Sequence, residues 1–291
     1  MRITNKVLVK GYLSDLKNNL QNMKKYQEQL SSGKEIKRPS DDPFKVARSM
    51  ELSSSISANE RYKSNIDEGL GWLETTDEAL AQINDSLQRI RELVVQGSTD
   101  TYDATQRQAI QKEIDQLKEQ IMQIGNTAYD GRYIFGGDKT TNPPFEADST
   151  ESSGIKYNGS TNGLLREFSQ GVTMDIAVTG NKLLDIFSVV SKISNDLGSG
   201  NSPGDYLDDI DDEIDKVLIL RAEVGAKSNR LEAMSSKNEE ETYNMTELLS
   251  KTQDIDIAEK YMEYSTMSSV YTASLKVGAQ ILQQSILDFL S

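Results

Sequence analysis

The sequence predicts a mainly α-helical fold, with long antiparallel helices from both chain ends and a small central β-rich insert. Apolar residues recur every three or four positions in both flanks, whereas they alternate every second position between Gly171 and Gly180. Twelve of the 19 glycines lie between Gly125 and Gly204. Long stretches without proline flank this middle segment, so the flanks can form long helices while the centre must turn often. The five prolines are Pro39, Pro43, Pro143, Pro144 and Pro203.

The first predicted helix carries one narrow apolar stripe, interrupted only at Gln27. Its members are Val9, Leu13, Leu16, Leu20, Met23 and Leu30. After Gly33 the pattern is lost, and a second helix is expected to begin at Ser40-Asp41-Asp42-Pro43. There an Asp can cap the helix and Pro43 can occupy its first turn.

Two further helices are expected to form an antiparallel hairpin. Apolar positions at steps of three and four run from Leu73 to Val94 and again from Ile110 to Ile124, with a polar turn over 97–103 between them. Helical spacing returns at Leu207 and continues to Leu231. The last stripe consists of Ile257, Tyr261, Tyr264, Tyr271, Leu275, Leu282 and Phe289, and it is widened by Val270, Val277 and Ile281.

Between these helices the period changes to two. Val172, Met174, Ile176 and Val178 alternate with polar or small residues, as in a strand with one buried face. Short strands at 155–157 and 164–168 are predicted, joined by the Asn-Gly turns at 158–159 and 162–163. The expected domains are 1–42 with 255–291 (a terminal coiled-coil domain), 43–130 with 205–254 (a helical bundle), and 131–204 (a β-rich outer domain).

The terminal stripes predict helices that are not stable alone. About a dozen stripe side chains offer ~1.5 to 3 kcal/mol each when fully buried, while each ordered residue costs ~1 to 2 kcal/mol in backbone entropy. A two-helix pair also leaves the widened C-terminal face uncovered. We therefore expect both ends to be disordered in the monomer and to fold together when subunits assemble, although periodicity alone equally allows ordinary internal packing.

Composition excludes many functions. The chain has 291 residues, a net charge of −14, and neither His nor Cys. It therefore lacks an imidazole base, a thiol nucleophile and the usual zinc ligands, so we expect no enzyme activity, no cofactor and no metal. The acidic balance argues against nucleic acid and anionic lipid as partners. No apolar run is long enough for a secretory signal or a membrane span.

One acidic run, Asp208 to Asp215, could be taken for a cation site. It lacks the glycine and the ligand spacing of a calcium loop, and Ile210 and Ile214 place it on a helix with one buried face. A solvated face near a helix start is the preferred interpretation. Gly136-Gly137 likewise lacks the motif of a phosphate-binding loop.

Several stretches resemble the bacterial flagellin superfamily. They are Leu30 to Lys34 followed by Ser40-Asp41-Asp42-Pro43, the block from Arg89 to Gln96 with Ile110 to Gln120, the segment Asn126 to Gly131, and the run from Asp254 to Leu290. Within that superfamily, three features resemble the proteins of the hook-filament junction more than filament flagellins. These are Met1 to Thr4 together with Pro39, the segment Gly131 to Gly137, and Ile155 to Gly159.

The resemblance implies a structural protein of the bacterial flagellum, linking hook to filament through a coiled-coil assembly of terminal helices. It implies copies of the chain itself, a hook-side junction protein and filament flagellin as partners, and a cytoplasmic export chaperone at the C-terminal region. It also implies export by the flagellar type III apparatus to the extracellular flagellum, without a cleaved signal peptide. Two alternatives stay open: a filament flagellin, and a module that binds a cation or a small molecule.

Overall fold

The structure is a computed structural model that describes residues 5–99, 102–148, 150–151 and 153–290, with helix side chains described from 7 to 280. The opening Met1 to Thr4 lies outside the described residues. The chain divides into two compact units. The terminal unit comprises 1–57 and 242–291, and the central unit comprises 58–241. The predicted fold class, mainly helical with a small β insert, is confirmed.

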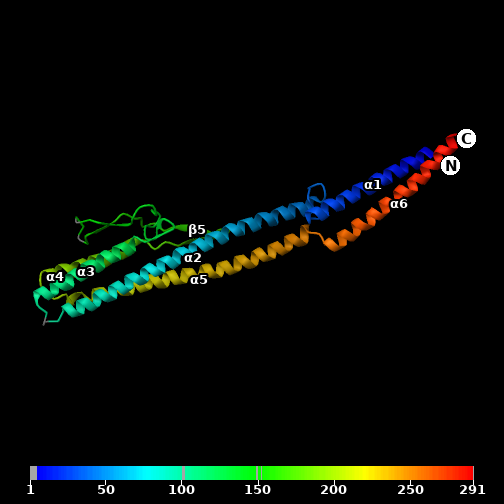
Figure 1. The fold of residues 1–291 in the computed structure, drawn as a ribbon. Helices are drawn as coiled ribbons and strands as arrows, with labels where there is room; N and C mark the ends of the chain where they lie inside the picture. Colours follow the sequence, from blue (N-terminus) through cyan, green and yellow to red (C-terminus); the bar gives the residue numbers. More distant parts are fainter. Residues whose placement is uncertain (1–4, 100–101, 149, 152, 291) are drawn as a thin grey trace. The chain divides into compact units, whose positions relative to one another are not determined.

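The terminal unit contains helix α1 (Asn5–Ser32) and helix α6 (Ile257–Leu290). These two helices lie side by side in opposite directions, so that the start of α1 and the end of α6 lie at the same end of the pair (Figure 1). The unit also holds the first turns of α2 (Pro43–Gly97) and the last turns of α5 (Leu207–Gln253). Long helices thus come from both chain ends, as the apolar stripes predicted.

Helix α2 begins where the sequence predicted. The Asp42 carboxylate accepts hydrogen bonds from the backbone N–H groups of Phe44 and Lys45, each at 3.0 Å, and Pro43 is the first helical residue. An unpaired N–H group at a helix start is satisfied by such a cap. The two helical segments predicted after residue 43 are one continuous helix of 55 residues.

Replacing Asp42 by Ala is expected to loosen the start of α2 without unfolding the central unit. Loss of a cap of this kind costs about 0.5 to 2 kcal/mol, which corresponds to amide exchange faster by about two- to thirty-fold at residues 43–50. Hydrogen exchange read by mass spectrometry measures this change. Unchanged exchange at the start of α2 would contradict the cap, and Ser40→Ala provides a control in the same turn.

The central unit is built on the antiparallel pair of α2 and α5. Three ion pairs mark their register at successive levels: Lys63 with Glu239 at 2.8 Å, Arg221 with Asp77 at 3.0 Å, and Arg91 with Asp211 at 2.5 Å. Such exposed pairs contribute little stability but show how the helices are aligned. The apolar positions from Leu73 to Val94 face inward from this pair, and Leu73, Leu80 and Ile83 are fully buried.

Helix α3 (Ala104–Gly125) returns against α2, which confirms the predicted hairpin. A capping box starts it: the Asp103 carboxylate accepts from the backbone N–H of Gln106 at 2.8 Å, and the Gln106 side chain accepts from the backbone N–H of Asp103 at 3.0 Å. Arg89 of α2 and Glu113 of α3 are paired at 2.7 Å.

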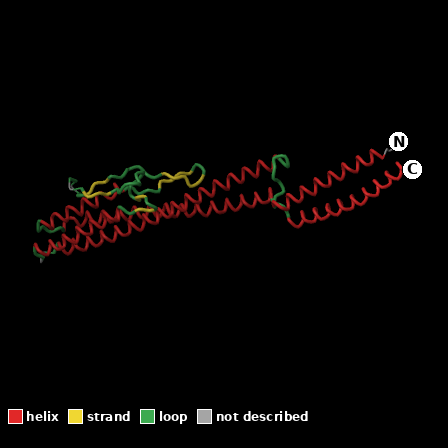
Figure 2. Tube along the Cα trace, turned by 45° about the horizontal axis from the view of Figure 1, so that its top comes forward, coloured by secondary structure: helices red, strands yellow, loops and turns green. Residues whose placement is uncertain are grey.

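Among the residues that the structure describes, six short strands form three separate antiparallel pairs, and strands are drawn in yellow in Figure 2. The pairs are β1 (Ala128–Tyr129) with β2 (Arg132–Tyr133), β3 (Phe145–Ala147) with β4 (Ile155–Tyr157), and β5 (Leu165–Ser169) with β6 (Val172–Asp175). Asp130 and Gly131 adopt φ values of +48° and +73° between β1 and β2. Residues that tolerate positive φ are needed in a two-residue hairpin turn of this kind.

The prediction that Asn-Gly turns join the strands is wrong. Strand β4 pairs backward with β3, and the N–H of Asn158 continues that ladder by donating to the carbonyl of Pro144 at 2.8 Å. The β5–β6 hairpin turns at Gly171, whose φ is +72°. The alternating segment from Val172 is a strand only to Asp175; Ile176 and Val178 are buried beyond its end.

Helix α4 (Leu184–Gly198) was not predicted from the sequence. It follows a short 3-10 helix, η1 (Gly180–Leu183), and another, η2 (Gly204–Tyr206), precedes α5. Phe187 of α4 packs against Phe145 with ring centroids 5.4 Å apart. The middle segment and the helices therefore share one hydrophobic core. The three predicted domains, 1–42 with 255–291, 43–130 with 205–254, and 131–204, stay a prediction.

Candidate assembly surface

The face that α1 turns toward α6 follows a seven-residue repeat with steps of three and four. Half-buried side chains mark this face, and we call them the α1 seam: Val9, Tyr12, Leu16, Asn19, Met23, Tyr26 and Leu30. Four of the six stripe residues predicted for α1 belong to it. The other three seam positions, Tyr12, Asn19 and Tyr26, were missed, because only aliphatic residues and Met were counted in the stripe of the first helix.

Leu13 and Leu20 were predicted in the same stripe but lie beside the α1 seam. Their side chains are 54% and 48% exposed. Each follows a seam residue by one position, and the rotation of about 100° per residue turns them from α6 toward solvent. Both leucines are therefore free to contact a neighbouring molecule.

Helix α6 presents a matching seam made largely of small and polar residues. Six half-buried or buried positions follow one another at steps of three and four, and we call them the α6 seam: Lys260, Tyr264, Met267, Tyr271, Ser274 and Gly278. Glu263 and Ser268 are also half-buried and lie beside this seam. Tyr264 and Tyr271 were predicted, whereas Ile257, Tyr261 and Leu275 are 68%, 64% and 44% exposed. Leu282 and Phe289 lie in α6, but their side chains are outside the described residues.

Two tyrosines of α1 fix the alignment of the seams. The Tyr12 hydroxyl donates to the carbonyl of Ser274 at 3.0 Å, and a Cβ added at Gly278 would overlap the Tyr12 ring. Glycine at this position therefore lets the ring lie against the α6 backbone. Near the other end of the pair, the Lys260 ammonium is 5.7 Å from the centre of the Tyr26 ring. The pKa of Lys260 is raised by the hydrogen bond that its ammonium group donates to Glu263 at 2.8 Å.

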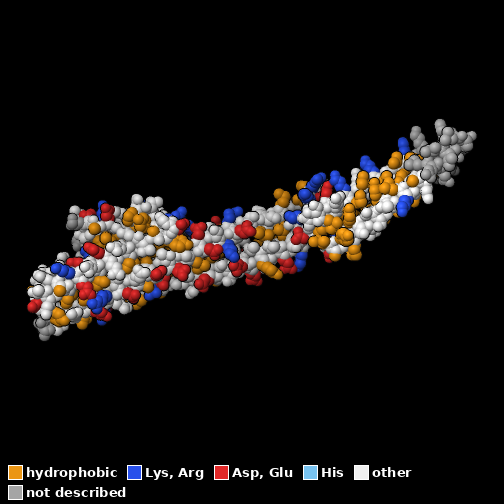
Figure 3. Space-filling view, viewed as in Figure 1, with side chains coloured by type: hydrophobic (Ala, Val, Ile, Leu, Met, Phe, Trp, Pro, Cys, Tyr) orange, Lys and Arg blue, Asp and Glu red, His pale blue; other side chains and the backbone are white. Residues whose placement is uncertain are grey.

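The α1–α6 pair has no apolar core among its described side chains, 7–32 and 257–280. In these ranges the buried residues are Gln29 and Gly278 alone. The central unit, by contrast, holds fully buried side chains such as Ile66, Leu73 and Phe135. Hydrophobic side chains remain visible along the surface of both terminal helices (Figure 3). An apolar helix face that stays exposed marks an interaction surface.

A short backbone clip joins the connection after α1 to the connection before α6. Lys34 and Asp254 form an antiparallel bridge, the N–H of Glu35 donates to the carbonyl of Gln253 at 2.6 Å, and the N–H of Ile255 donates to the carbonyl of Gly33 at 3.1 Å. Gly33 has a φ of +72°, which favours glycine. The clip sets the register at which the two terminal helices begin to pair.

The predicted family motif shapes the adjoining turn. The Asp41 carboxylate accepts from the backbone N–H groups of Arg38 at 3.0 Å and Lys37 at 3.3 Å, and these bonds lower the pKa of Asp41 below its usual value. Ser40 is exposed in this turn, while Asp42 caps α2 and Pro43 begins it. Asp41, Asp42 and Pro43 thus have a local structural role.

The acidic run at the start of α5 is only partly solvated. Asp211 pairs with Arg91, and Glu213 is buried, with its carboxylate accepting from Lys216 at 2.6 Å. In the part of the chain that the structure describes, no three His, Cys, Asp or Glu side chains come together as metal ligands. Across the same residues, no helix has the length and apolarity needed to cross a bilayer.

These features define a class of protein: a helical structural subunit whose two chain ends pair with each other. Comparisons with known proteins agree. Residues 3–140 match the bacterial flagellin N-terminal helical region, and residues 207–290 match the bacterial flagellin C-terminal helical region. Flagellin from Bacillus subtilis is 30% identical over 98% of this chain and 97% of that protein. The chain therefore belongs to the bacterial flagellin family, as the sequence resemblance predicted.

Other relatives are hook-associated proteins. Flagellar hook-associated protein 3 from Escherichia coli is 26% identical over 95% of each chain. The crystal structure of Bacillus cereus FlgL is 25% identical, with a TM-score of 0.60 over 69% of this chain and 99% of that one. A putative flagellar hook-associated protein from Vibrio parahaemolyticus shares the fold, with a TM-score of 0.66 over 74% of this chain and 100% of that one, at 22% identity.

Proposed function

We propose that this chain is a structural protein of the flagellum that joins the hook to the filament, as a hook-associated protein of type 3. The observation that carries an assembly role is the α1–α6 pair, which contains no buried apolar side chain over residues 7–32 and 257–280. Side chains such as Leu13, Leu20, Tyr261 and Leu275 stay exposed along it. Neighbouring subunits would cover these faces and supply the missing core.

The contacts between subunits would be heterologous, with different surfaces meeting in a head-to-tail manner. Such contacts open into a helix, and adjacent protein types would end it on either side. We propose copies of this chain, a hook-side junction protein and filament flagellin as those neighbours. The predicted interface residues Leu282 and Phe289 continue the C-terminal stripe and belong to the same proposal.

Export to the extracellular flagellum through the flagellar type III apparatus, without a cleaved signal peptide, is part of this proposal. Absence of Cys supports it, because the chain can form no disulfide that would obstruct threading through a channel. A cytoplasmic chaperone would hold the C-terminal region before export. The incomplete burial of α6 supports this step, since exposed apolar side chains need protection before assembly.

Filament flagellin is the second candidate, and the 30% identity to Bacillus subtilis flagellin favours it. The junction role is favoured by the hook-associated relatives and by the resemblance of the sequence from Gly131 to Gly137 to that of junction proteins. In the structure this segment includes strand β2 and the buried pair Ile134 and Phe135.

Immunogold labelling of isolated flagella separates the two candidates. Antibody against the purified chain is expected to label a short band at the distal end of the hook. Labelling along the whole shaft would instead show a filament subunit. A strain that lacks the chain but keeps its flagellin gene provides the control: it should carry bare hooks and secrete unassembled flagellin.

A further inference from the structure

Helix α1 carries a second regular stripe, separate from the seam that faces α6. Lysine and leucine alternate along it at steps of three and four, and every member is exposed. We call it the Lys-Leu ladder: Lys10, Leu13, Lys17, Leu20 and Lys24. At about 100° per residue, these positions lie on one face of the helix, roughly a quarter turn from the α1 seam.

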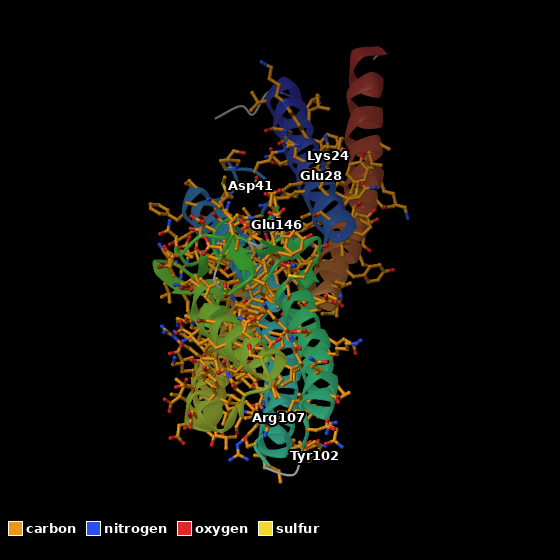
Figure 4. All side chains as sticks on the ribbon, turned by 90° about the vertical axis from the view of Figure 1, so that its left-hand side faces the viewer. Lys24, Glu28, Asp41, Tyr102, Arg107 and Glu146 are labelled. Atoms are coloured by element: carbon orange, nitrogen blue, oxygen red, sulfur yellow. The ribbon has the colours of Figure 1, made fainter. Side chains whose placement is uncertain are left out.

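The ladder lacks partners for most of its charges. Lys24 is 3.9 Å from Glu28, with side chains 75% and 49% exposed, and the two extend from the same helix (Figure 4). Among the described residues, no carboxylate lies within 4.0 Å of the Lys10 or Lys17 ammonium group, the limit for an ion pair. The two leucines between these lysines are about half exposed. A complementary surface would offer carboxylates on either side of an apolar side chain.

Positive and negative side chains are distributed unevenly along the chain. Residues 1–48 hold 11 Lys and Arg against 5 Asp and Glu, a net charge of +6. The other 243 residues hold 21 basic against 41 acidic side chains, a net charge of −20. The part of a second copy over residues 49–291 therefore carries a net charge opposite to that of the ladder, and such an opposite charge steers association.

One exposed stripe of α5 matches the ladder in spacing as well as in charge. Glu240, Tyr243 and Glu247 follow at steps of three and four, as do Lys17, Leu20 and Lys24. All three are exposed, and Tyr243 is 70% exposed. Among the described side chains, Glu247 is paired only with Lys251 of its own helix, and an exposed pair of this kind can exchange at little cost.

We propose that the Lys-Leu ladder of one copy docks on the Glu240–Tyr243–Glu247 stripe of a second copy. Leu20 would lie against the Tyr243 ring, with an ion pair on each side. This contact rests on the proposed assembly function and names the two surfaces that meet. It differs from the contact between the α1 seam and the α6 seam, which is formed within one chain.

Thiol cross-linking between purified full-length chains tests the contact directly, because the chain contains no Cys. A size-tagged Leu20→Cys chain is mixed with a Tyr243→Cys chain and treated with a short bis-maleimide. The matched control replaces Tyr243→Cys by Leu165→Cys, whose parent side chain is 69% exposed against 70% for Tyr243. The mixture with Tyr243→Cys is expected to give at least about fivefold more heterodimer than the control, and less at high salt.

Charge reversal adds a second readout. Glu240→Lys in the Tyr243→Cys chain is expected to lower the yield, and Lys17→Glu or Lys24→Glu in the other chain should restore it. Restoration by Lys17→Glu indicates parallel helices, and restoration by Lys24→Glu indicates antiparallel ones. Equal yields with Tyr243→Cys and Leu165→Cys, restoration by neither reversal, or no association of the wild-type chain at any concentration would each overturn the proposal. If immunogold labelling still gave a band at the distal end of the hook, the proposed function would stand even though this contact between copies was wrong.

Discussion

Replacing Leu16 by Asp is expected to abolish incorporation of the chain into the flagellum while the central unit stays folded. Leu16 lies at the middle of the α1 seam, half-buried against α6. Full burial of an exposed leucine is worth about 1.5 to 3 kcal/mol, so completing the burial of the half-buried Leu16 is worth about half of that. Losing this part alone weakens the contact about four- to thirteenfold, and the desolvation cost of a new carboxylate adds to the loss.

Asn18→Asp is the matched control, because it adds the same charge on an exposed face of α1 away from both the α1 seam and the Lys-Leu ladder. The measurement is the amount of each variant in purified flagella, with fluorescence of Trp72 reporting the fold of the central unit. Trp72 is only 3% exposed and lies in that unit. Normal incorporation of Leu16→Asp would show that the α1 seam has no part in assembly.

Replacing Phe187 by Ala is expected to destabilise the central unit by about 3 to 5 kcal/mol. Phe187 is 1% exposed and its ring packs against Phe145. Removing a large aromatic side chain from a packed core loses its burial and leaves a cavity. The loss is a large fraction of the ~5 to 15 kcal/mol that typically stabilises a folded protein.

Urea unfolding followed by Trp72 fluorescence measures this change as a lower midpoint. Leu165→Ala serves as the control, since that side chain is 69% exposed and its loss is expected to cost less than about 0.5 kcal/mol. A Phe187→Ala midpoint equal to that of the wild-type chain would mean that α4 is not part of the central core.

The long helices of the central unit could be predicted because their buried faces are built from aliphatic residues. Leu73, Leu80 and Ile83 are apolar and fully buried, so the three-four pattern of residue types coincides with the pattern of burial. The start of α2 could be predicted for a similar reason, because Asp42 and Pro43 act locally. Neither inference needs knowledge of distant contacts.

The seams of the terminal helices could be predicted only in part. Tyr12, Asn19, Ser274 and Gly278 belong to the seams but carry no apolar signal, whereas Leu20 carries that signal and is exposed. The stripe predicted for α1 from apolar residues therefore lies partly on the solvent-facing side of the α1 seam. That displacement shows where apolar surface remains to be covered after the two helices have paired.

The middle segment shows two other limits. The sequence of helix α4 does carry a helical pattern, because Ile186, Phe187, Val190, Ile193 and Leu197 are spaced for one face. The glycines around it, however, are typical of turns. Pairing of β3 with β4 could not be read from spacing, because a strand pattern does not specify its partner. Asn158-Gly159 accordingly has the composition of a hairpin turn without forming one.

Amide hydrogen exchange of the isolated monomer tests the central claim most directly, which is that the terminal helices are completed only by neighbouring subunits. Exchange is predicted to be fast over 5–32 and 257–290, slow over 66–97 in the central core, and slow in all of these ranges after assembly. Slow exchange over both terminal helices in the monomer would contradict the claim, because it would show that the α1–α6 pair is stable without a neighbour.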